Sequence, residues 1–342
     1  MDHGSLVVAV HIGAGYHSTL KEKVYKSLIK KACLAAMQCL KQSSSAGDAV
    51  ERAIQTLEDS RLTNAGKGSN LNRKGQVECD ASMMCSNPDA FGAVGAVTTI
   101  CNPIQAAHAV MKAQGIGPDP QNGLVPPMLL VGHGAEQWAE ANNVATSNDI
   151  RHLITPEALD KYARYMDQAF STHPTQPDDD ILLDTVGAVC IDSTGVVAAG
   201  VSSGGIALKY PGRVGEAAMF GCGCWAQAQN AQLSGCSVSG TGEQISRLLL
   251  AKLCAQKTSD IFAGLDETFA EFCTSSALSM YVERNAGLIL LRKTENGSTE
   301  LGVAHTTASM GYGFMTGSMK GPKARVSRKQ KIDKPTIMAF HL

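Results

Sequence analysis

The sequence lacks a long hydrophobic run and an excess of charge of either sign. No stretch of its 342 residues approaches the roughly 18 consecutive apolar residues of a membrane-spanning helix. The 30 Lys and Arg residues nearly balance the 31 Asp and Glu residues, for a formal net charge of −1. A chain so balanced has no general basic surface for nucleic acids or anionic membranes. We therefore expect neither a membrane nor a nucleic acid as partner.

Paired cysteines and a secretory signal are also missing. The 11 cysteines are an odd number, and several lie inside apolar runs, which is typical of buried, reduced thiols in a reducing compartment. The apolar start Leu6–Val10 is only as long as a strand and lacks the flanks of a signal peptide. We expect an intracellular protein of the cytoplasm, the nucleus or both that is not secreted.

No residue spacing indicates a metal or a cofactor. One residue separates Cys222 from Cys224, whereas zinc sites usually have two to four between their cysteines. Gly13-Ala14-Gly15 resembles part of a dinucleotide-binding motif but lacks the third glycine. We predict that the protein has neither a metal nor a cofactor.

The composition that is present, 44% hydrophobic and 18% charged, is globular. Strands and helices are expected in both halves without regular alternation, which favours stacked sheets covered by helices over a doubly wound sheet. His11–Gly15 is expected as a loop, and the basic tail after Lys320 as loose chain. The expected helices cover residues 20–41, 47–58, 103–113, 134–141, 156–170, 242–256 and 261–275, and the strands 6–10, 76–84, 91–100, 185–192, 196–202, 287–292 and 300–305.

One segment differs in character from the rest. Residues 171–184 are polar, acidic and contain prolines, so they cannot bury enough surface to order themselves and predict a flexible linker. Directly after them come Thr185–Asp192 and Val196–Ser202, which are apolar on both faces. This pattern is typical of neighbouring strands inside a layered sheet. We expect one domain over residues 1–342 that contains this linker.

The junction between linker and strand suggests chemistry. A threonine hydroxyl is a poor nucleophile unless a base lies within hydrogen-bond reach. Breaking the Asp184–Thr185 bond would give Thr185 a free α-amine, with a reference pKa of roughly 7.7–8.0. One residue would then supply both nucleophile and base. This pattern alone favours Thr185 as an ordinary first residue of a strand, because threonine is common there.

Further motifs lie along nearly the whole chain. They are Leu6–Ser18, Leu57–Ser60, Asn64–Asn72, Glu78–Ser82, Leu183–Val189, Val201–Gly205, Lys209–Gly215, Phe220–Ala226 and Ser237–Glu243. Together these motifs resemble the plant-type asparaginase family of N-terminal-nucleophile hydrolases, and Phe220–Ala226 is closest to the taspase (threonine aspartase) form within it. The resemblance implies a four-layer αββα sandwich and Thr185 as nucleophile.

The resemblance also assigns roles to individual residues. Ser203 matches the family's second catalytic hydroxyl, which would hydrogen-bond the Thr185 amine. Ser239 and Gly240 match the pair that forms the oxyanion hole, although Ser239 could also cap the following helix. Arg213 matches the arginine that holds a substrate carboxylate, for which a guanidinium fork is well suited.

Further positions match less directly. Glu216 stands where asparaginases have an aspartate that holds the substrate's α-ammonium, a charge that taspase does not need. In a taspase, Glu216 would be a spectator held by Arg213. The supporting loops beside the nucleophile are expected around Gly13, Gly15, Asn64 and Gly66.

The sequence thus predicts a self-processing threonine endopeptidase that cleaves proteins, nuclear regulatory proteins among them, after aspartate. Cleavage between Asp184 and Thr185 would give an α chain of residues 1–184 and a β chain of residues 185–342, which the resemblance implies form a dimer of αβ units. Two alternatives remain open. One is an isoaspartyl peptidase or L-asparaginase, which Glu216 favours. The other is a non-enzymatic interaction protein with the same fold.

Overall fold

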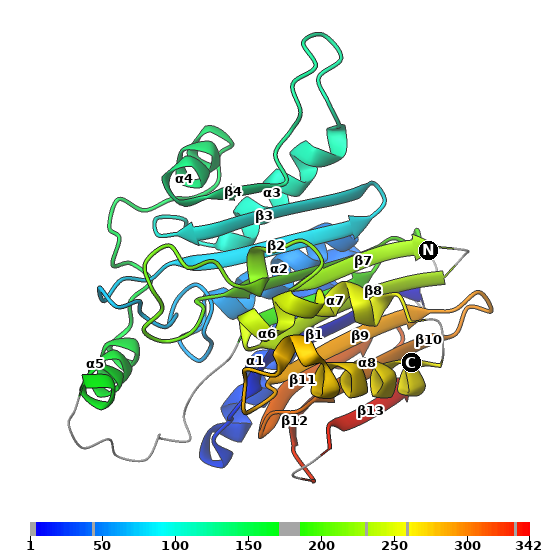
Figure 1. Cartoon of the computed structure of the whole chain (residues 1–342). Helices are drawn as coiled ribbons and strands as arrows, with labels where there is room; N and C mark the ends of the chain where they lie inside the picture. The colour runs from blue at the N-terminus through cyan, green and yellow to red at the C-terminus, as the bar shows by residue number, and fades with distance from the viewer. Residues whose placement is uncertain (1–4, 43–44, 171–184, 230–231, 258–259, 332–333) are drawn as a thin grey trace.

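The computed structural model describes residues 5–42, 45–170, 185–229, 232–257, 260–331 and 334–342 (Figure 1). The predicted linker, residues 171–184, lies outside these ranges and is drawn as a thin grey trace. The described part contains two sheets, one of eight strands and one of five. The predicted sandwich with outer helices is therefore correct.

The larger sheet runs in the order β12-β11-β1-β5-β6-β2-β3-β4. Neighbouring strands are antiparallel except the β3–β4 pair. Its strands are β1 (Val7–Gly15), β2 (Cys79–Ser86), β3 (Asp89–Val97), β4 (Leu129–Val131), β5 (Val186–Ile191), β6 (Val197–Ser203), β11 (Ser309–Thr316) and β12 (Lys323–Arg328).

The smaller sheet runs in the order β13-β10-β9-β8-β7, and all its pairs are antiparallel. It lies against the larger sheet, where β6 contacts β7 and β8. Its strands are β7 (Cys224–Gln229), β8 (Gln232–Gly240), β9 (Ala286–Lys293), β10 (Thr299–His305) and β13 (Thr336–His341).

Helices cover the outer faces of both sheets (Figure 1). On the larger sheet, α1 (Glu22–Lys41) contacts β11, α2 (Ala46–Glu58) contacts β5 and β6, and α3 (Pro103–Ile116) contacts β3. On the smaller sheet, α7 (Leu250–Ala255) contacts β8, and α8 (Ile261–Thr274) contacts β10. The remaining helices are α4 (Gly132–Ala141), α5 (Pro156–Phe170) and α6 (Gly242–Leu248).

Strand β5 shows why residues 185–192 are apolar on both faces. Val186 and Ala188 belong to the core beneath the outer helices, whereas Val189 and Ile191 belong to the core between the sheets. Successive side chains of a strand point to opposite faces. Since both faces of β5 are covered, every position is buried.

The segments before and after the linker interleave in the larger sheet. Strand β5 lies between β1 and β6, and β2 in turn pairs with β6. Strand β1 also pairs with β11, so separating residues 1–184 from 185–342 would break three strand pairings. It would also expose the cores on both sides of them, at about 25 cal/mol per Å² of apolar surface.

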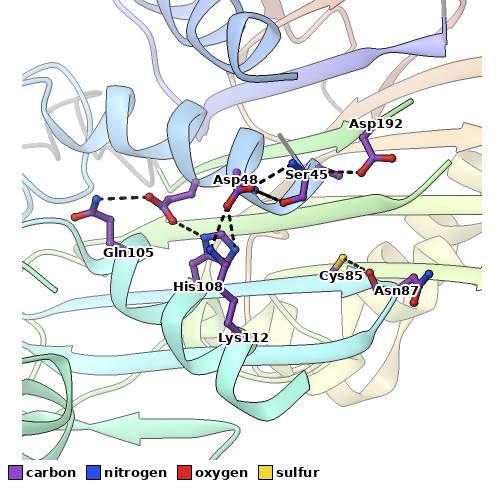
Figure 2. A network of polar contacts seen from close by, with 10 residues as sticks. Ser45, Asp48, Cys85, Asn87, Gln105, His108, Lys112 and Asp192 are labelled. Carbon is purple, nitrogen blue, oxygen red and sulfur yellow. Dashed lines mark hydrogen bonds and ion pairs between the residues drawn. The ribbon is translucent and has the colours of Figure 1, made fainter. Parts of the chain in front are cut away.

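A polar network fixes the hairpin that follows the junction (Figure 2). Asp192, at the end of β5, accepts a hydrogen bond from the Ala46 nitrogen at the start of α2 (3.0 Å). Its other oxygen accepts from the turn nitrogens of Thr194 and Val196. Figure 2 also shows the capping box in which Ser45 and Asp48 bond each other's backbone nitrogens. The hairpin and the first turn of α2 are therefore held together.

The structure corrects three expectations. Residues 11–15 belong to β1 rather than to a loop, although the register shifts between His11 and Ala14. The expected helix 242–256 breaks at Leu249, which has a positive φ of 48°. The tail after Lys320 forms the edge strands β12 and β13 rather than loose chain. Strands β7, β8 and β11 were not foreseen.

Candidate active site

Thr185 lies directly before β5 and is 2% exposed. Its Oγ1 is 3.0 Å from Ser203 Oγ and 3.0 Å from Glu216 Oε1. Because β5 and β6 pair with Val186 opposite Ser202, the register places Ser203 beside Thr185. The two hydroxyl residues predicted from the sequence are therefore neighbours on adjacent strands.

A tight turn after β6 holds Ser203 in place. Gly205 donates its N–H to Ser203 Oγ (3.0 Å) and has a φ of +73°, a conformation that favours glycine. The Gly205 carbonyl accepts from the side-chain amides of Asn64 and Asn70, each at 2.9 Å. Asn64, expected in a supporting loop, thus braces the turn that carries Ser203.

Arg213 is held by a partner that the sequence did not suggest. Its Nε and Nη2 donate to the two carboxylate oxygens of Glu243, each at 2.9 Å. This is the bidentate fork by which arginine binds a substrate carboxylate. Glu243 accepts both of these hydrogen bonds, while Arg213 acts on the expected partner Glu216 through its charge.

Glu216 begins a short 3-10 helix, η3 (Glu216–Ala218), and is 3% exposed. Burial raises the pKa of its carboxyl, while the Arg213 charge and the Thr185 hydrogen bond act in the opposite direction. The side chain is therefore a buried acid in direct contact with the candidate nucleophile.

Two acidic residues of the matching segment Glu78–Ser82, to which the sequence assigned no role, position Arg213 and Glu216. Asp80 accepts from the Gly215 nitrogen (2.9 Å), and Glu78 accepts from the Gly212 nitrogen (3.0 Å). Both hydrogen bonds anchor the backbone on either side of Arg213. Acidic residues two apart at the start of a buried strand were a signal that could have identified them.

A second buried acid lies on the other face of β6. Glu58 accepts hydrogen bonds from Ser202 Oγ (2.6 Å) and from the Ile104 nitrogen (3.0 Å), and burial raises its pKa to about 8. Ser202 and Ser203 are consecutive strand residues, so their side chains point to opposite faces. Glu58 therefore resembles Glu216 in burial but has no contact with the pocket.

His11 and Ser237 contact each other between the two sheets, beside Gly187, which lies two residues along the chain from Thr185. His11 Nε2 is 2.9 Å from Ser237 Oγ, which donates to the Gly200 carbonyl (2.9 Å). Burial lowers the pKa of His11 to about 3, although the nearby Thr185 backbone favours the charged form. A Cβ on Gly187 would lie 2.0 Å from Ser237 Oγ, so glycine is required there.

Ser239 and Gly240 end β8 beside the pocket. Ser239 is fully buried, and its Oγ accepts from the Ala14 nitrogen (2.9 Å). The bulged part of β1 around Gly13 and Gly15 therefore supports Ser239. The helix that follows has Thr241 as its N-cap, so the alternative role of Ser239 as a cap is wrong.

One small, partly open pocket gathers most of the predicted site residues. Neither Ser239, Gly13, Gly15 nor Gly66 is among the described residues that line it; Gly66 instead packs its backbone against Glu58. The lining consists of Asn64, Thr185, Ser203, Gly205, Ile206, Arg213, Glu216, Gly240 and Gly242.

The described ranges contain neither a metal-binding cluster nor a membrane-spanning helix. There, no three His, Cys, Asp or Glu side chains gather as a metal site would require. Among the same residues, no helix combines the length and apolar character needed to cross a bilayer.

A sandwich of two sheets between helices, with a buried threonine where a strand begins, defines the class of N-terminal-nucleophile hydrolases. A family model described as "Asparaginase" matches residues 4–321. The chain belongs to this asparaginase family, whose members process themselves and hydrolyse amide bonds.

Curated relatives share much of their length with this chain. An isoaspartyl peptidase/L-asparaginase of Xenopus laevis is 36% identical over 72% of this chain and 74% of its own. The corresponding protein of Mus musculus is 35% identical over 73% of this chain and 71% of its own. A plant-type L-asparaginase of Pyrococcus abyssi is 32% identical over 94% of this chain and 100% of its own.

Proposed function

We propose that the chain cuts itself between Asp184 and Thr185 and then hydrolyses aspartyl amide bonds with Thr185 as nucleophile. The contact of Thr185 Oγ1 with Ser203 Oγ at 3.0 Å supports this. After cleavage the new α-amine acts as base, and the Ser203 hydroxyl hydrogen-bonds it and tunes its basicity. The Gly240 N–H and the Ser239 hydroxyl stabilise the oxyanion, an effect of roughly 2.7–4 kcal/mol per donor in other acyl-transfer enzymes.

The observation that carries the substrate assignment is the pairing of opposite charges in the pocket. Arg213 and Glu216 both line it beside Thr185. A β-aspartyl group presents a free α-carboxylate and a free α-ammonium on one carbon, which matches such a pair. We therefore propose isoaspartyl peptides and L-asparagine as the first substrate class. The names of the Xenopus and Pyrococcus relatives support this choice.

Glu243 acts as a stand-in for the substrate in this scheme. Its carboxylate occupies the fork of Arg213 and is 42% exposed, against 14% for the Arg213 side chain. The substrate's α-carboxylate displaces Glu243 toward solvent and takes over the same two hydrogen bonds. Arg213 therefore exchanges one carboxylate for another, and its charge is never buried alone.

The second candidate is an endopeptidase that cuts after aspartate, as in taspase. An ordinary aspartyl residue carries the same two carboxyl groups with their roles exchanged. Its side-chain carboxylate would bind Arg213, and its α-carbonyl, which forms the peptide bond, would face Thr185. Its α-nitrogen is then a neutral amide. Glu216 would then have no substrate charge to pair with, and the Phe220–Ala226 segment resembles taspase.

A matched set of substrates separates the two classes. We would measure kcat/KM of the matured protein for a β-aspartyl dipeptide, its N-acetyl derivative, L-asparagine and a peptide with an internal aspartate. The first class predicts that acetylation lowers kcat/KM about 30-fold or more, because a charge contact worth on the order of 2–5 kcal/mol is lost. Equal rates with and without the acetyl group, together with faster cleavage of the internal-aspartate peptide, would assign the endopeptidase.

The two fragments are proposed to remain one unit after cleavage and to associate as a dimer of αβ units. The interleaved strands β1, β5, β6 and β2 support the first statement. Sizing of the matured protein without denaturant should give one species that contains both fragments at twice the mass of one αβ unit. Fragments that elute separately would contradict the unit, and an αβ monomer would contradict the dimer.

A further inference from the structure

Self-cleavage needs a different base from the one that serves the matured enzyme. In the matured enzyme the α-amine of Thr185 serves as base. Before the cut, this nitrogen belongs to the Asp184–Thr185 peptide bond, and an amide nitrogen is not a useful base. Some other group must accept the hydroxyl proton when Thr185 first attacks.

Three polar side chains of the described residues lie close enough to be considered. Ser203 touches Thr185 Oγ1, but a hydroxyl is too weak a base. His11 lies near the Thr185 backbone, yet burial lowers its pKa to about 3, so it binds protons poorly. Glu216 Oε1 lies 3.0 Å from Thr185 Oγ1 and is a carboxyl group whose burial raises its basicity.

The hydroxyl hydrogens of Thr185 and Ser203 determine which of the two residues donates to the other. Thr185 has one hydroxyl hydrogen and two partners, so it can donate to only one of them at a time. Ser203 Oγ already accepts the Gly205 N–H, and its own hydroxyl hydrogen can point to Thr185 Oγ1. In that arrangement Ser203 donates to Thr185, and Thr185 donates to Glu216. The Thr185 proton then faces the carboxylate.

We propose that Glu216 is the catalytic base of self-cleavage. This inference rests on the proposed role of Thr185 as nucleophile but not on the substrate class. Glu216 takes the Thr185 hydroxyl proton as Oγ1 bonds to the carbonyl carbon of Asp184. The C–N bond then breaks, and the nitrogen gains the proton that Glu216 accepted. The resulting ester between Asp184 and Thr185 is hydrolysed by water, which leaves a carboxylate and the free hydroxyl.

The surroundings of Glu216 suit this task. Arg213 faces it with a positive charge, whereas Asp80 is a second buried acid whose charge raises the Glu216 pKa. Glu243, on the first turn of α6, accepts the two Arg213 hydrogen bonds, which leaves both oxygens of Glu216 free of that arginine's fork. Asp80 also fixes the Gly215 nitrogen (2.9 Å), so the carboxyl is held on a braced backbone.

The test is the rate at which the newly made full chain converts to two fragments. Cell-free translation followed by a timed chase gives this rate by gel, and N-terminal sequencing identifies the cut. Glu216→Gln retains an oxygen that can accept the Thr185 hydrogen bond but cannot take up the proton. We expect conversion at least about 100-fold slower, the usual contribution of a general base. Glu216→Asp, which keeps a carboxylate on a shorter side chain, should restore part of the rate.

Glu58→Gln is the matched control, since Glu58 is an equally buried acid bonded to the neighbouring serine of β6. It should mature at the wild-type rate. The wild-type rate should also fall about tenfold per pH unit below the Glu216 pKa, and Glu216→Gln should lack this dependence. These measurements keep the test decisive even if one variant folds poorly.

Two results would have different meanings. A Glu216→Gln chain that converts within threefold of wild type, with Thr185 as the new N-terminus, overturns Glu216 as the base. Fragments from Thr185→Ala with the same cut would instead overturn the nucleophile itself and hence the proposed function.

Discussion

Two polar clusters lie one pleat apart between the sheets, and they differ in charge. The inner cluster joins His11, Ser237 and the Gly200 carbonyl through neutral hydrogen bonds. The outer cluster, around Thr185, contains the carboxyl of Glu216 and the guanidinium of Arg213 and lines a pocket. Burial drives His11 to its neutral form, whereas the outer cluster keeps opposite charges close together.

The difference shows that burial of polar groups does not by itself make a reactive site. His11 is as deeply buried as Thr185, yet it is not among the described residues that line the pocket. The outer cluster combines a hydroxyl, a nearby acid and an open space. The following predictions separate the chemical role of the outer cluster from the structural role of the inner one.

The largest effect is expected from Thr185→Ala. Removing the nucleophile should abolish maturation and lower amide hydrolysis by on the order of a million-fold, as in other enzymes with a nucleophilic side chain. Stability should hardly change, since Ala is readily accommodated at the start of a strand. A gel, an activity assay and a urea titration check this prediction. Strongly reduced stability would mean that the outer cluster is structural like the inner one.

Arg213→Ala should follow, with kcat/KM reduced about 30- to several-thousand-fold, because a charge contact with the substrate is worth on the order of 2–5 kcal/mol. Most of the loss should appear in KM. The control is Arg52→Ala, an exposed arginine on α2 that bonds Gln55. Steady-state kinetics on the preferred substrate checks both, and equal losses in the two variants would contradict the assignment.

Gly187→Ala tests the inner cluster. The added Cβ would lie 2.0 Å from Ser237 Oγ and 2.5 Å from His11 Nε2, so the sheets must shift. Overpacking of this kind typically costs about 1–3 kcal/mol. Urea unfolding in the uncut Thr185→Ala background measures it on a single chain. Gly134→Ala, on α4 with no atom near the added Cβ, should be neutral or stabilising.

The smallest effect concerns pH. The folded-state pKa of His11 is lowered to about 3, so its contribution to stability is present above the unfolded pKa near 6.5 and is lost as pH falls toward 3. In the same uncut background, His11→Asn should reduce the slope of unfolding free energy against pH by up to about 1.4 kcal/mol per unit between pH 6 and 4. His133→Asn, an exposed histidine, should leave the slope unchanged.

The sequence predicted the sandwich, most helices and the strand pair at Thr185 because those signals are local. Apolar periodicity identifies α2 and β5, and the motifs single out Thr185, Ser203 and Arg213. The strands β12 and β13 lie at the edges of their sheets, where each pairs with only one neighbouring strand, and they belong to a basic tail that predicts loose chain. Every residue of these two strands is exposed or only partly buried, so neither strand resembles the buried strands that the sequence identified.

The amino-acid sequence alone determined the chemical inventory: a threonine before a buried strand, a second hydroxyl 18 residues on, and an arginine after a glycine-rich turn. Only the tertiary structure decided which groups meet. The contacts of Glu216 with Thr185, of Glu243 with Arg213 and of Asp80 with Gly215 join segments 30 to 135 residues apart. Sequence spacing carries no information about such distances, because strand register and loop conformation fix them when the two sheets pack.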